Sequence, residues 1–588
     1  MKNIIGIDLG TTNSEVAIIK NNQPHIISIN NDNFMPSCVG IDDQGKILVG
    51  RAAKNQMVLR PESTILSIKR MMGEKTTILM GGRSFTPTEI SALILKELKK
   101  CAEEFCGESI DEAVITVPAY FDDHQRKSTQ NAGKLAGLEV KRIINEPTAA
   151  ALAYGVNHQQ NQTILVYDLG GGTFDVSLVV IEDEIVEVKA SHGDTHLGGD
   201  DFDNLLIDHI AEEFLNKHEI DLRQDPRTRN RIWQAVEKAK IELSSQPYTT
   251  ILEEYITPEK HLEMEISRYD YEIMIQPLIS KTFDCINECL RDADLLPGDL
   301  DQIILVGGSS RTPLIHTQLE NVFNTTIHSE INPDLIVAMG AAIQSGIISG
   351  MKSEGILVDI TPYSFGTSAH EFDFFMPGEG QFVPIIKRNT PLPTRKSEVF
   401  YTVADNQKAV DVEIYQGEDP IAENNIRVGN FLIENLSPKP QGNPIVLDIK
   451  LDLNGILEVT ATEKVSGLSK TVRMSSVNSI SEYDFTESQK KLMEFDDGND
   501  YDSISPEVTE ENGETSRQNA TGQQKELLRR AKSLRQRAEK ISDRLDEDDT
   551  LEINNLLDTS KECVKNSDWK KLTQTCESLS DILFYLED

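Results

Sequence analysis

The chain has 588 residues, of which 38% are apolar and 26% are charged. This is the composition of a globular protein, and the length exceeds what one hydrophobic core supports, so we expect about three or four domains. The formal net charge of −38 argues against a nucleic-acid backbone as the main partner. No apolar run is long enough to span a bilayer, no secretory signal is recognised, and the seven scattered cysteines fit a reducing compartment. We therefore expect a cytoplasmic protein whose cysteines are buried thiols rather than metal ligands.

Two segments in the first third of the chain follow one plan. IIGIDLGTTNSEVAII (4–19) and TILVYDLGGGTFDVSLVVI (163–181) each place Asp-Leu-Gly and a small, hydroxylated turn between two β-branched runs. The repetition predicts two strand–turn–strand hairpins, each of which opens one of two similar α/β lobes.

The second of these turns holds three consecutive glycines, residues 170–172, followed by Thr173. A tight turn needs only one or two glycines, and glycine within a strand usually marks the close approach of a ligand or another backbone. The flanking carboxylates of Asp168 and Asp175 indicate a cation nearby. If the two turns face each other across a cleft, Asp8 joins these carboxylates around one site. A hairpin turn with solvated aspartates is the alternative for this stretch taken alone.

A third glycine-containing element is QIILVGGSSRTPLI (302–315), which reads as a buried strand, two glycines and a helix with Pro313 near its start. Backbone amides at such a helix N-terminus suit a phosphate or a nucleotide. One glycine loop is weak evidence, but three of them, two related by repetition, predict a phosphate-binding cleft.

Motifs in one continuous order from Ile4 to about Ser475 resemble the seventy-kilodalton heat-shock chaperone family (DnaK type). The matching segments are IGIDLGTTNS, VITVPAYF, RIINEPTAAALAYG, YDLGGGTFDVS, GDTHLGGDDFD, EKAKIELSS and ILVGGSSRTP. The chain is similar to short, divergent bacterial members and somewhat HscC-like. The resemblance implies a multidomain fold with an actin-like, twin-lobed α/β ATPase domain, an antiparallel β-sandwich peptide-binding domain and a C-terminal α-helical bundle.

The resemblance also implies hydrolysis of ATP to ADP and phosphate, with Mg²⁺ and, as a further candidate, K⁺. Phosphoryl transfer to water depends on positioning and charge neutralisation more than on covalent chemistry. Asp8 and Asp168 would hold Mg²⁺ largely through water, and Lys69 would offset charge at the γ-phosphate. Without its motif, Lys69 would be interpreted as a solvated surface lysine. The catalytic residues implied by the resemblance are Lys69, Glu146, Asp168, Thr173 and Asp175.

Further nucleotide contacts come from the same resemblance. In EKAKIELSS, the spacing places Glu237, Lys240 and Ser244 on one helix face, where they would meet the base and ribose; a solvated helix face has the same pattern. The remaining ATP-binding residues would be Gly10, Thr11, Thr12, Asn13, Gly170, Gly171, Gly172, Gly198, Gly199, Gly307, Gly308, Ser309, Arg311 and Asp334.

The part of the chain beyond residue 352 argues against a sugar kinase or a filament-forming actin relative. EGILVDITP is a short apolar segment that resembles the family's interdomain linker, and an exposed apolar linker is unusual unless it docks. We predict an ATPase domain at 1–352, a linker at 353–360, a β domain at 361–482, an acidic, disordered tether at 483–521 and a lid-like helical bundle at 522–588.

Alternating strands predict the β domain. Val410, Val412 and Ile414 alternate with Asp411, Glu413 and Tyr415, which predicts one buried and one polar face. A second strand pair joins through Asn454-Gly455, and its predicted buried face is Leu447, Ile449, Leu451 and Leu453.

In the family, this β domain binds extended apolar peptides in a cleft. The motif VFYTVADNQKAVDV carries the cleft residues over to Phe400, Val403, Gln407, Val410 and Val412, for which plain sheet core is the alternative. Thr367 and His370 fall where the family pattern has apolar residues.

The resulting expectation is an ATP-dependent molecular chaperone of the heat-shock class that binds and releases unfolded segments. The coupling residues implied by the family motifs are Pro118, Arg126, Arg142, Asn145, Ile356, Leu357, Val358 and Asp359, with Arg142, Asn145 and Asp359 at positions that meet a J-domain co-chaperone. Expected partners are unfolded clients, a J-domain protein and a nucleotide-exchange factor, with no nucleic acid or membrane, and the protein is expected to be a monomer. The alternative is a nucleotide-gated holdase or regulatory exchange factor with low ATP turnover.

Overall fold

The computed structural model describes residues 3–155, 161–183, 185–323, 325–328, 332–351, 356–369, 380–474 and 482–496, and the single residues 553, 556, 559, 571 and 575. The chain divides into two compact units, residues 1–502 and 503–588. Apart from those five residues, the predicted helical bundle lies outside the described part. Among the described residues, no helix is long and apolar enough to cross a membrane.

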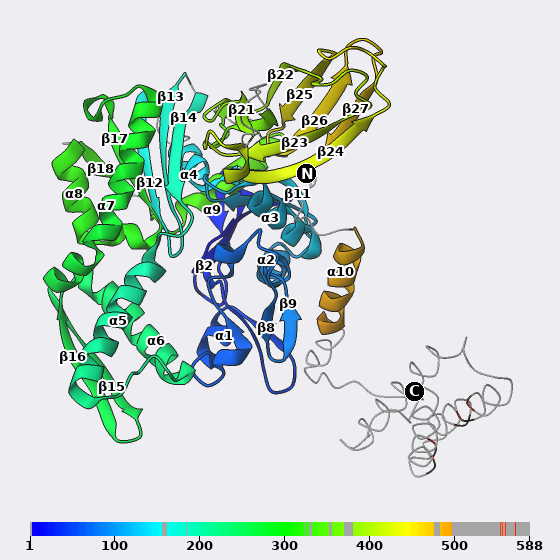
Figure 1. Ribbon diagram of the computed structural model, residues 1–588. Helices are drawn as coiled ribbons and strands as arrows, with labels where there is room; N and C mark the ends of the chain where they lie inside the picture. Colours follow the sequence, from blue (N-terminus) through cyan, green and yellow to red (C-terminus); the bar gives the residue numbers. More distant parts are fainter. Residues whose placement is uncertain are drawn as a thin grey trace. The chain divides into compact units, whose positions relative to one another are not determined.

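The first lobe is built on a six-stranded sheet (Figure 1). Its main path runs β11-β10-β1-β2-β3, with β4 paired to β2. The strands are β1 (Ile4–Leu9), β2 (Asn13–Lys20), β3 (Gln23–Ile26), β4 (Met35–Pro36), β10 (Glu112–Val117) and β11 (Glu139–Asn145). β1 pairs antiparallel with β2 and parallel with β10.

The second lobe repeats this order as β18-β17-β12-β13-β14, with β19 added at the edge. Its strands are β12 (Gln162–Leu169), β13 (Phe174–Glu182), β14 (Ile185–Asp194), β17 (Gln302–Val306), β18 (Thr326–His328) and β19 (Ile356–Val358). β12 pairs antiparallel with β13 and parallel with β17, as β1 does with β2 and β10. The two predicted hairpins are therefore present, at equivalent places in two similar sheets.

Helices and smaller sheets complete the two lobes. The helices are α1 (Arg51–Gln56), α2 (Pro87–Cys106), α3 (Asp123–Leu135), α4 (Glu146–Gly155), α5 (Gly199–His218), α6 (Pro226–Leu243), α7 (Arg268–Ala293), α8 (Pro313–Phe323) and α9 (Ile336–Ile348). The small sheets are β5 (Val39–Ile41) with β6 (Ile47–Val49) and β7 (Thr64–Ile65), β8 (Ile78–Met80) with β9 (Arg83–Phe85), and β15 (Tyr248–Thr257) with β16 (Lys260–Ser267).

The lobes join where α4 and α9 cross. Both helices are rich in alanine and glycine, and their small side chains let the two backbones come close. A Cβ atom added at Gly340 would lie 1.9 Å from the carbonyl oxygen of Ala149, so only glycine fits there. Apolar residues of both sheets and both helices form one buried cluster at this crossing, which fixes the positions of the two hairpins.

The β domain consists of two four-stranded antiparallel sheets, ordered β21-β20-β23-β24 and β22-β25-β26-β27. Its strands are β20 (Phe365–Ala369), β21 (Gln381–Ile386), β22 (Thr394–Tyr401), β23 (Ala409–Gln416), β24 (Ile426–Glu434), β25 (Pro444–Leu451), β26 (Leu457–Glu463) and β27 (Ser469–Arg473). One apolar cluster contains side chains from both sheets, so the two sheets pack face to face.

Two details of the predicted alternation are wrong. Leu453 was expected on the buried face, but it is 46% exposed because β25 ends at Leu451 and the chain then enters the turn that contains Gly455. Tyr415 was expected on the polar face, but it is buried because the pairing of β23 with β24 is irregular between Ile414 and Tyr415.

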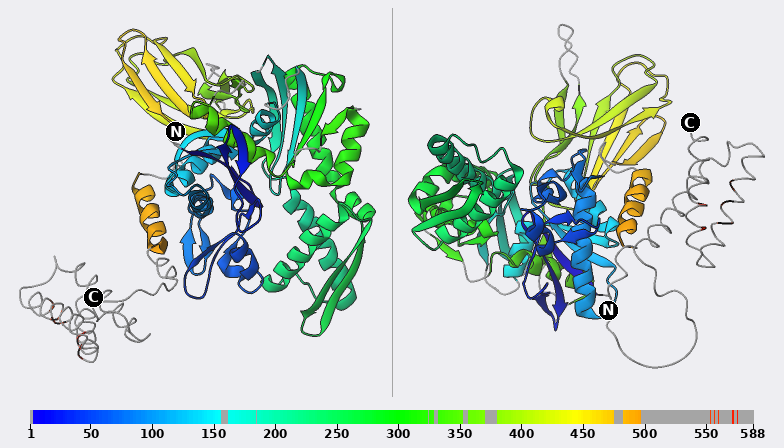
Figure 2. Two further views of the ribbon diagram at one scale, coloured as in Figure 1. Left: turned by 180° about the vertical axis from the view of Figure 1, so that it is seen from behind. Right: turned by 90° about the horizontal axis from the view of Figure 1, so that it is seen from below.

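The first part of the predicted tether, up to residue 496, is helical, and its remainder lies outside the described residues. Residues Glu482–Asp496 form a helix, α10, that lies beside α2 and α3 of the first lobe (Figure 2). Leu492 is buried in the core cluster of that lobe, and the ammonium of Lys491 lies 2.7 Å from Oε2 of Glu89. Amphipathic packing and an ion pair therefore hold a segment whose acidic composition alone predicted disorder.

Candidate functional site

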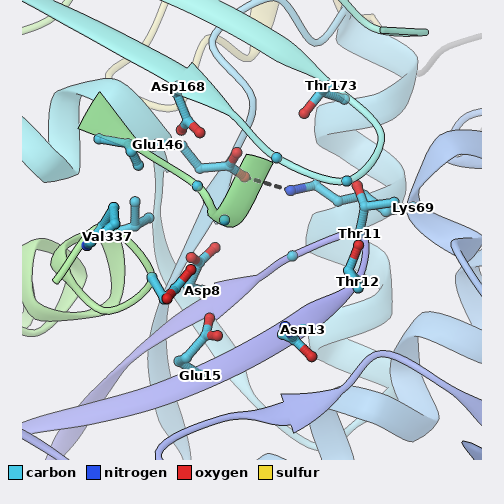
Figure 3. A pocket seen from close by; sticks show the side chains of 18 residues that line it. Asp8, Thr11, Thr12, Asn13, Glu15, Lys69, Glu146, Asp168, Thr173 and Val337 are labelled. Atoms are coloured by element: carbon cyan, nitrogen blue, oxygen red, sulfur yellow. Dashed lines mark hydrogen bonds and ion pairs between the residues drawn. The ribbon is translucent and has the colours of Figure 1, made fainter. Parts of the chain in front are cut away.

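One cavity of about 90 Å³ lies where the β1–β2 turn faces the β12–β13 turn (Figure 3). Its lining residues are Asp8, Gly10, Thr11, Thr12, Asn13, Glu15, Lys69, Glu146, Asp168, Gly170, Gly171, Thr173, Val306, Gly307, Gly308, Pro333, Asp334 and Val337. We call this space the hairpin cavity.

Glycine makes the close approach of the two turns possible. A Cβ atom on Gly171 would lie 1.9 Å from Oγ1 of Thr12, and one on Gly172 would lie 2.7 Å from Cγ2 of Thr11. Gly199 donates its N–H to the carbonyl oxygen of Gly170 at 3.0 Å, which supports the glycine turn at the start of α5. Gly171 and Gly172 therefore let the two hairpins touch.

Lys69 is the only basic side chain that lines the hairpin cavity. It lies on a short 3-10 helix, Ile68–Met71, and its ammonium is 2.5 Å from Oε1 of Glu146 at the start of α4. Burial alone would lower the pKa of Lys69, but the carboxylates of Glu146 and Asp8 outweigh burial and raise it above its ordinary value. The lysine therefore presents a permanent positive charge to the cavity.

The carboxylates of the site are held in different ways. Thr116 donates its hydroxyl to Oδ1 of Asp8 at 2.7 Å, and the N–H of Tyr120 donates to Oδ1 of Asp175 at 3.0 Å. Burial raises the pKa of Asp175 to about 7 in spite of that hydrogen bond, and burial together with neighbouring acids raises the pKa of Asp168 well above its ordinary value. Asp175 lies next to the hairpin cavity without lining it.

The donor set of this cavity fits Mg²⁺. Five carboxylates line it (Asp8, Glu15, Glu146, Asp168 and Asp334) against the single ammonium of Lys69, so the space favours a cation. Among the described residues, no group of three or more side chains is close enough together to hold a metal ion by itself. Mg²⁺ keeps several of its waters, and carboxylates that contact the cation through water suit it.

The predicted adenine-side residues do not line the hairpin cavity. Glu237 accepts from the ammonium of Lys54 at 2.8 Å, and Lys240 donates to Oδ2 of Asp203 at 2.7 Å. Ser244, which follows the last residue of α6, donates its hydroxyl to the carbonyl oxygen of Lys240. Gly172, Gly198, Gly199, Ser309 and Arg311 also lie outside the lining, although Arg311 pairs with Asp334 at 2.8 Å. Contact of these residues with a base stays a prediction.

A second cavity, of about 550 Å³, opens in the β domain between its two sheets. All five predicted cleft residues line it: Phe400, Val403, Gln407, Val410 and Val412. Thr367 also lines this space, as do Tyr401 and Asp411, whereas His370 lies outside the described residues. The β-domain cleft is therefore lined by both apolar and polar side chains.

Hydrogen bonds link the first lobe to the segment that follows β19. Nδ2 of Asn145 donates to Asp359 at 3.0 Å, and Arg126 donates to Oδ1 of the same asparagine at 2.6 Å. Nε of Arg142 is buried and has no hydrogen-bond partner among the described residues, and the charge of Arg142 acts on Asp359. Pro118 lies in the same loop as Tyr120 and accepts the N–H of Phe121.

The β domain contacts both lobes directly. Arg388 donates to Asp292 of α7 at 2.7 Å, and the N–H of Asp123 at the start of α3 donates to Gln416 of β23 at 3.0 Å. The N–H of Ile143 donates to Asn454 in the β25–β26 turn. None of these three contacts was predicted from the sequence, because each of them joins segments that are distant along the chain.

Sequence reasoning also missed Glu15 and Thr116 around Asp8. The register of β1 with β2 sets Glu15 directly across from Asp8, so the pattern of the repeat could have identified it as the counterpart of Asp175. Thr116 reaches Asp8 from the parallel neighbour β10, which only the sheet order reveals.

Two similar α/β lobes meet at an acidic cavity with one lysine, and a β domain with its own cavity follows them; this arrangement defines the class of the fold. A family model described as Hsp70 protein matches residues 4–80 and 75–585. The chain therefore belongs to the Hsp70 protein family. Membership implies an ATP-binding, ATP-dependent chaperone, and members of the family are ATPases.

Proposed function

We propose that this protein couples ATP hydrolysis in the hairpin cavity to the binding and release of extended apolar peptides in the β-domain cleft. The observation that carries the proposal is β19. Its three residues pair in parallel with β14 of the second lobe, and the next residue, Asp359, bonds to Asn145 of the first lobe. One short segment thus contacts both lobes immediately before the β domain.

On the ATPase side, each residue of the site has its own role. Asp8 and Asp168 would hold Mg²⁺ largely through its waters, and the bound ion would neutralise phosphate charge. The ammonium of Lys69 faces the transferred phosphoryl group, where a fixed charge stabilises the transition state. Glu146 and Asp175 orient the attacking water, and Thr11, Thr12 and Thr173 offer hydroxyls and amides to phosphate oxygens.

On the peptide side, the cleft offers apolar side chains and strand edges. Phe400 and Val410 are partly buried at the margin of the β-domain core, and Val403 is 49% exposed. Such a surface supports binding of an extended segment by main-chain hydrogen bonds with apolar side chains in a central pocket. The hydroxyl of Thr367 is already used, since it donates to the carbonyl oxygen of Glu413.

Coupling between the ATP site and the peptide cleft requires an element with two arrangements. The ligands of the two sites must stabilise these arrangements to different extents. In this structure β19 is paired and Leu357 packs against the cluster at the α4–α9 crossing. We propose that nucleotide state controls whether this segment stays paired, and that a J-domain co-chaperone acts where Arg142, Asn145 and Asp359 meet. A nucleotide-exchange factor completes the cycle.

The test is steady-state ATP hydrolysis with and without a J-domain protein and an unfolded client. In wild type we expect stimulation by both additions. The double variant Leu357→Asp with Val358→Asp should keep basal hydrolysis and lose stimulation by client, because charged side chains do not dock in an apolar groove. The matched control is Leu252→Asp with Leu296→Asp, which places two charges at exposed leucines outside the linker.

Stimulation that survives the linker substitutions would contradict coupling through β19. The alternative, a holdase with low turnover, predicts a different result. Nucleotide would then change peptide affinity in wild type, while neither addition would change the hydrolysis rate.

A further inference from the structure

A third cavity, of about 430 Å³, lies between the segment that leads to Lys69 and the helices α5 and α6. Its lining includes Ser67 and Arg70 of the first lobe and Asp200, Arg223 and Arg229 of the second. We call this space the arginine cavity. It is separate from the hairpin cavity, because the two cavities share no lining residue.

Positive charge dominates the lining of the arginine cavity. Three arginines line it together with a single carboxylate, that of Asp200, to which Ser67 donates its hydroxyl at 2.6 Å. The acids that pair with Arg70 and Arg223 lie outside the lining. Arg229 is exposed and, within the described part of the chain, has no ion-pair partner. An arginine presents a planar fork of N–H donors that matches phosphate oxygens, so the space favours a phosphate-bearing anion.

The glycine turn lies between the arginine cavity and the hairpin cavity. Gly171 lines the hairpin cavity, and a Cβ atom on it would lie 3.2 Å from Oδ1 of Asp200. A Cβ atom on Gly172 would lie 2.8 Å from Cγ of Arg70. Lys69 lines the hairpin cavity and the next residue, Arg70, lines the arginine cavity. A phosphate ion that is cleaved from ATP in the hairpin cavity would therefore form close to these arginines.

We propose that the arginine cavity binds inorganic phosphate and takes up the phosphate that ATP hydrolysis leaves in the hairpin cavity. The inference rests on the proposed function, which supplies the phosphate. Arg229 contributes most to binding, because its guanidinium is not engaged by a carboxylate. The competing explanation is that the arginines only hold the two lobes together, as the pair of Arg70 with Asp201 does at 3.0 Å.

The experiment follows the fluorescence of Trp233, which lines the arginine cavity, while inorganic phosphate is added to the full chain saturated with Mg-ADP. The only other tryptophan of the sequence is removed by Trp569→Phe, so that Trp233 reports alone. Phosphate should give a saturable change that chloride at the same ionic strength does not give. Arg229→Gln should weaken the affinity for phosphate about 10-fold, because a charge-assisted hydrogen bond is lost. Arg223→Gln should weaken it as well.

The matched control is Arg227→Gln. Arg227 is exposed on the same helix, two residues before Arg229, and lies outside the lining, so the affinity for phosphate should stay within twofold. Absence of a saturable change, or an equal loss of affinity in the Arg227 and Arg229 variants, would overturn the proposal. A change that needs an excess of ADP and not phosphate would overturn it too, because the cavity would then take a second nucleotide.

ATP hydrolysis is measured separately on the same protein. A chain that hydrolyses ATP without any response of Trp233 to phosphate would contradict this inference and leave the proposed function standing. A chain that binds phosphate through Arg229 but does not hydrolyse ATP would contradict the proposed function and leave the phosphate site standing.

Discussion

The two hairpins share one backbone plan and differ in their electrostatic surroundings. Both set a pair of carboxylates face to face after an Asp-Leu-Gly turn. Asp175 in the second lobe is held by a backbone N–H, while Glu15 in the first lobe meets two further acids. Repetition of a strand–turn–strand unit thus preserves where side chains point, and the neighbours supplied by the rest of each lobe decide what those side chains do.

The largest effect is expected when the positive charge of Lys69 is removed from among the carboxylates of the two hairpins. Lys69→Ala removes the single ammonium of the hairpin cavity and should slow hydrolysis at least ~100-fold, since one preorganised charge near the transferred group commonly contributes that much. Single-turnover hydrolysis measures the rate, and ATP binding should change little. The control is Lys238→Ala, an exposed lysine on α6. A Lys69→Ala rate within threefold of wild type would remove this lysine from the chemistry.

A smaller effect, on nucleotide affinity, is expected from a substitution that pushes the two turns apart. Gly171→Ala forces its new methyl group against Oγ1 of Thr12, and the hairpins must move apart. We expect nucleotide affinity to fall about 10-fold, which is ~1.4 kcal/mol. Combining it with Thr12→Ala removes the clashing hydroxyl and should restore part of the loss. Affinity is measured by isothermal titration calorimetry with Mg-ATP.

The matched substitution in the first turn is Gly10→Ala, whose methyl group would meet the carbonyl oxygen of Asn13 at 2.0 Å. That oxygen belongs to the backbone, so no change of side chain removes the clash. Failure of Gly171→Ala to lower affinity would show that the turns do not meet in solution as they do here.

The smallest expected effect concerns Asp123, a carboxylate that belongs to neither hairpin and does not line the hairpin cavity. Asp123 is buried at the contact between α3 and the β domain, and burial raises its pKa from 3.8 to about 7. A raised pKa in the folded state means that the associated stability is fully present below pH 4 and is lost as the pH rises toward 7. Asp123→Asn mimics the protonated acid.

The variant should therefore match wild type at pH 4 and melt a few degrees higher at pH 8, with the difference growing between those values. Thermal unfolding followed by circular dichroism at a series of pH values measures this. A difference in melting temperature that is the same at pH 4 and pH 8 would exclude Asp123 as the titrating group.

The sequence alone predicts the parts of this molecule that depend on local patterns. Asp-Leu-Gly between two β-branched runs placed both hairpins, because the turn chemistry and the strand pattern occupy neighbouring residues. The same holds for the alternation that buried Ile449 and Leu451 in the β domain. Leu453 broke that alternation because the strand ended before it, and strand ends are weakly encoded.

Features that depend on distant segments could not be predicted in this way. The hydrogen bond from Lys54 to Glu237 joins residues 183 positions apart, and the helical pattern of α6 does not predict it. The packing of α10 depends on Glu89 and on the core of the first lobe, whereas its own acidic composition indicated disorder. Glu15 stood in the quoted motif, and its importance follows only from the register that sets it against Asp8.

The pairing of β19 with β14 affects where the chain can be cut to obtain a fragment that holds both lobes. An uncovered strand edge offers unpaired N–H and C=O groups that recruit other chains. Here the segment Ile356–Val358 pairs with the first three residues of β14, Ile185–Glu187, and covers that part of the edge. A fragment that ends at Gly350 keeps both lobes and leaves β14 bare. We expect such a fragment to dimerise or aggregate at concentrations where one that ends at Ile360 stays monomeric.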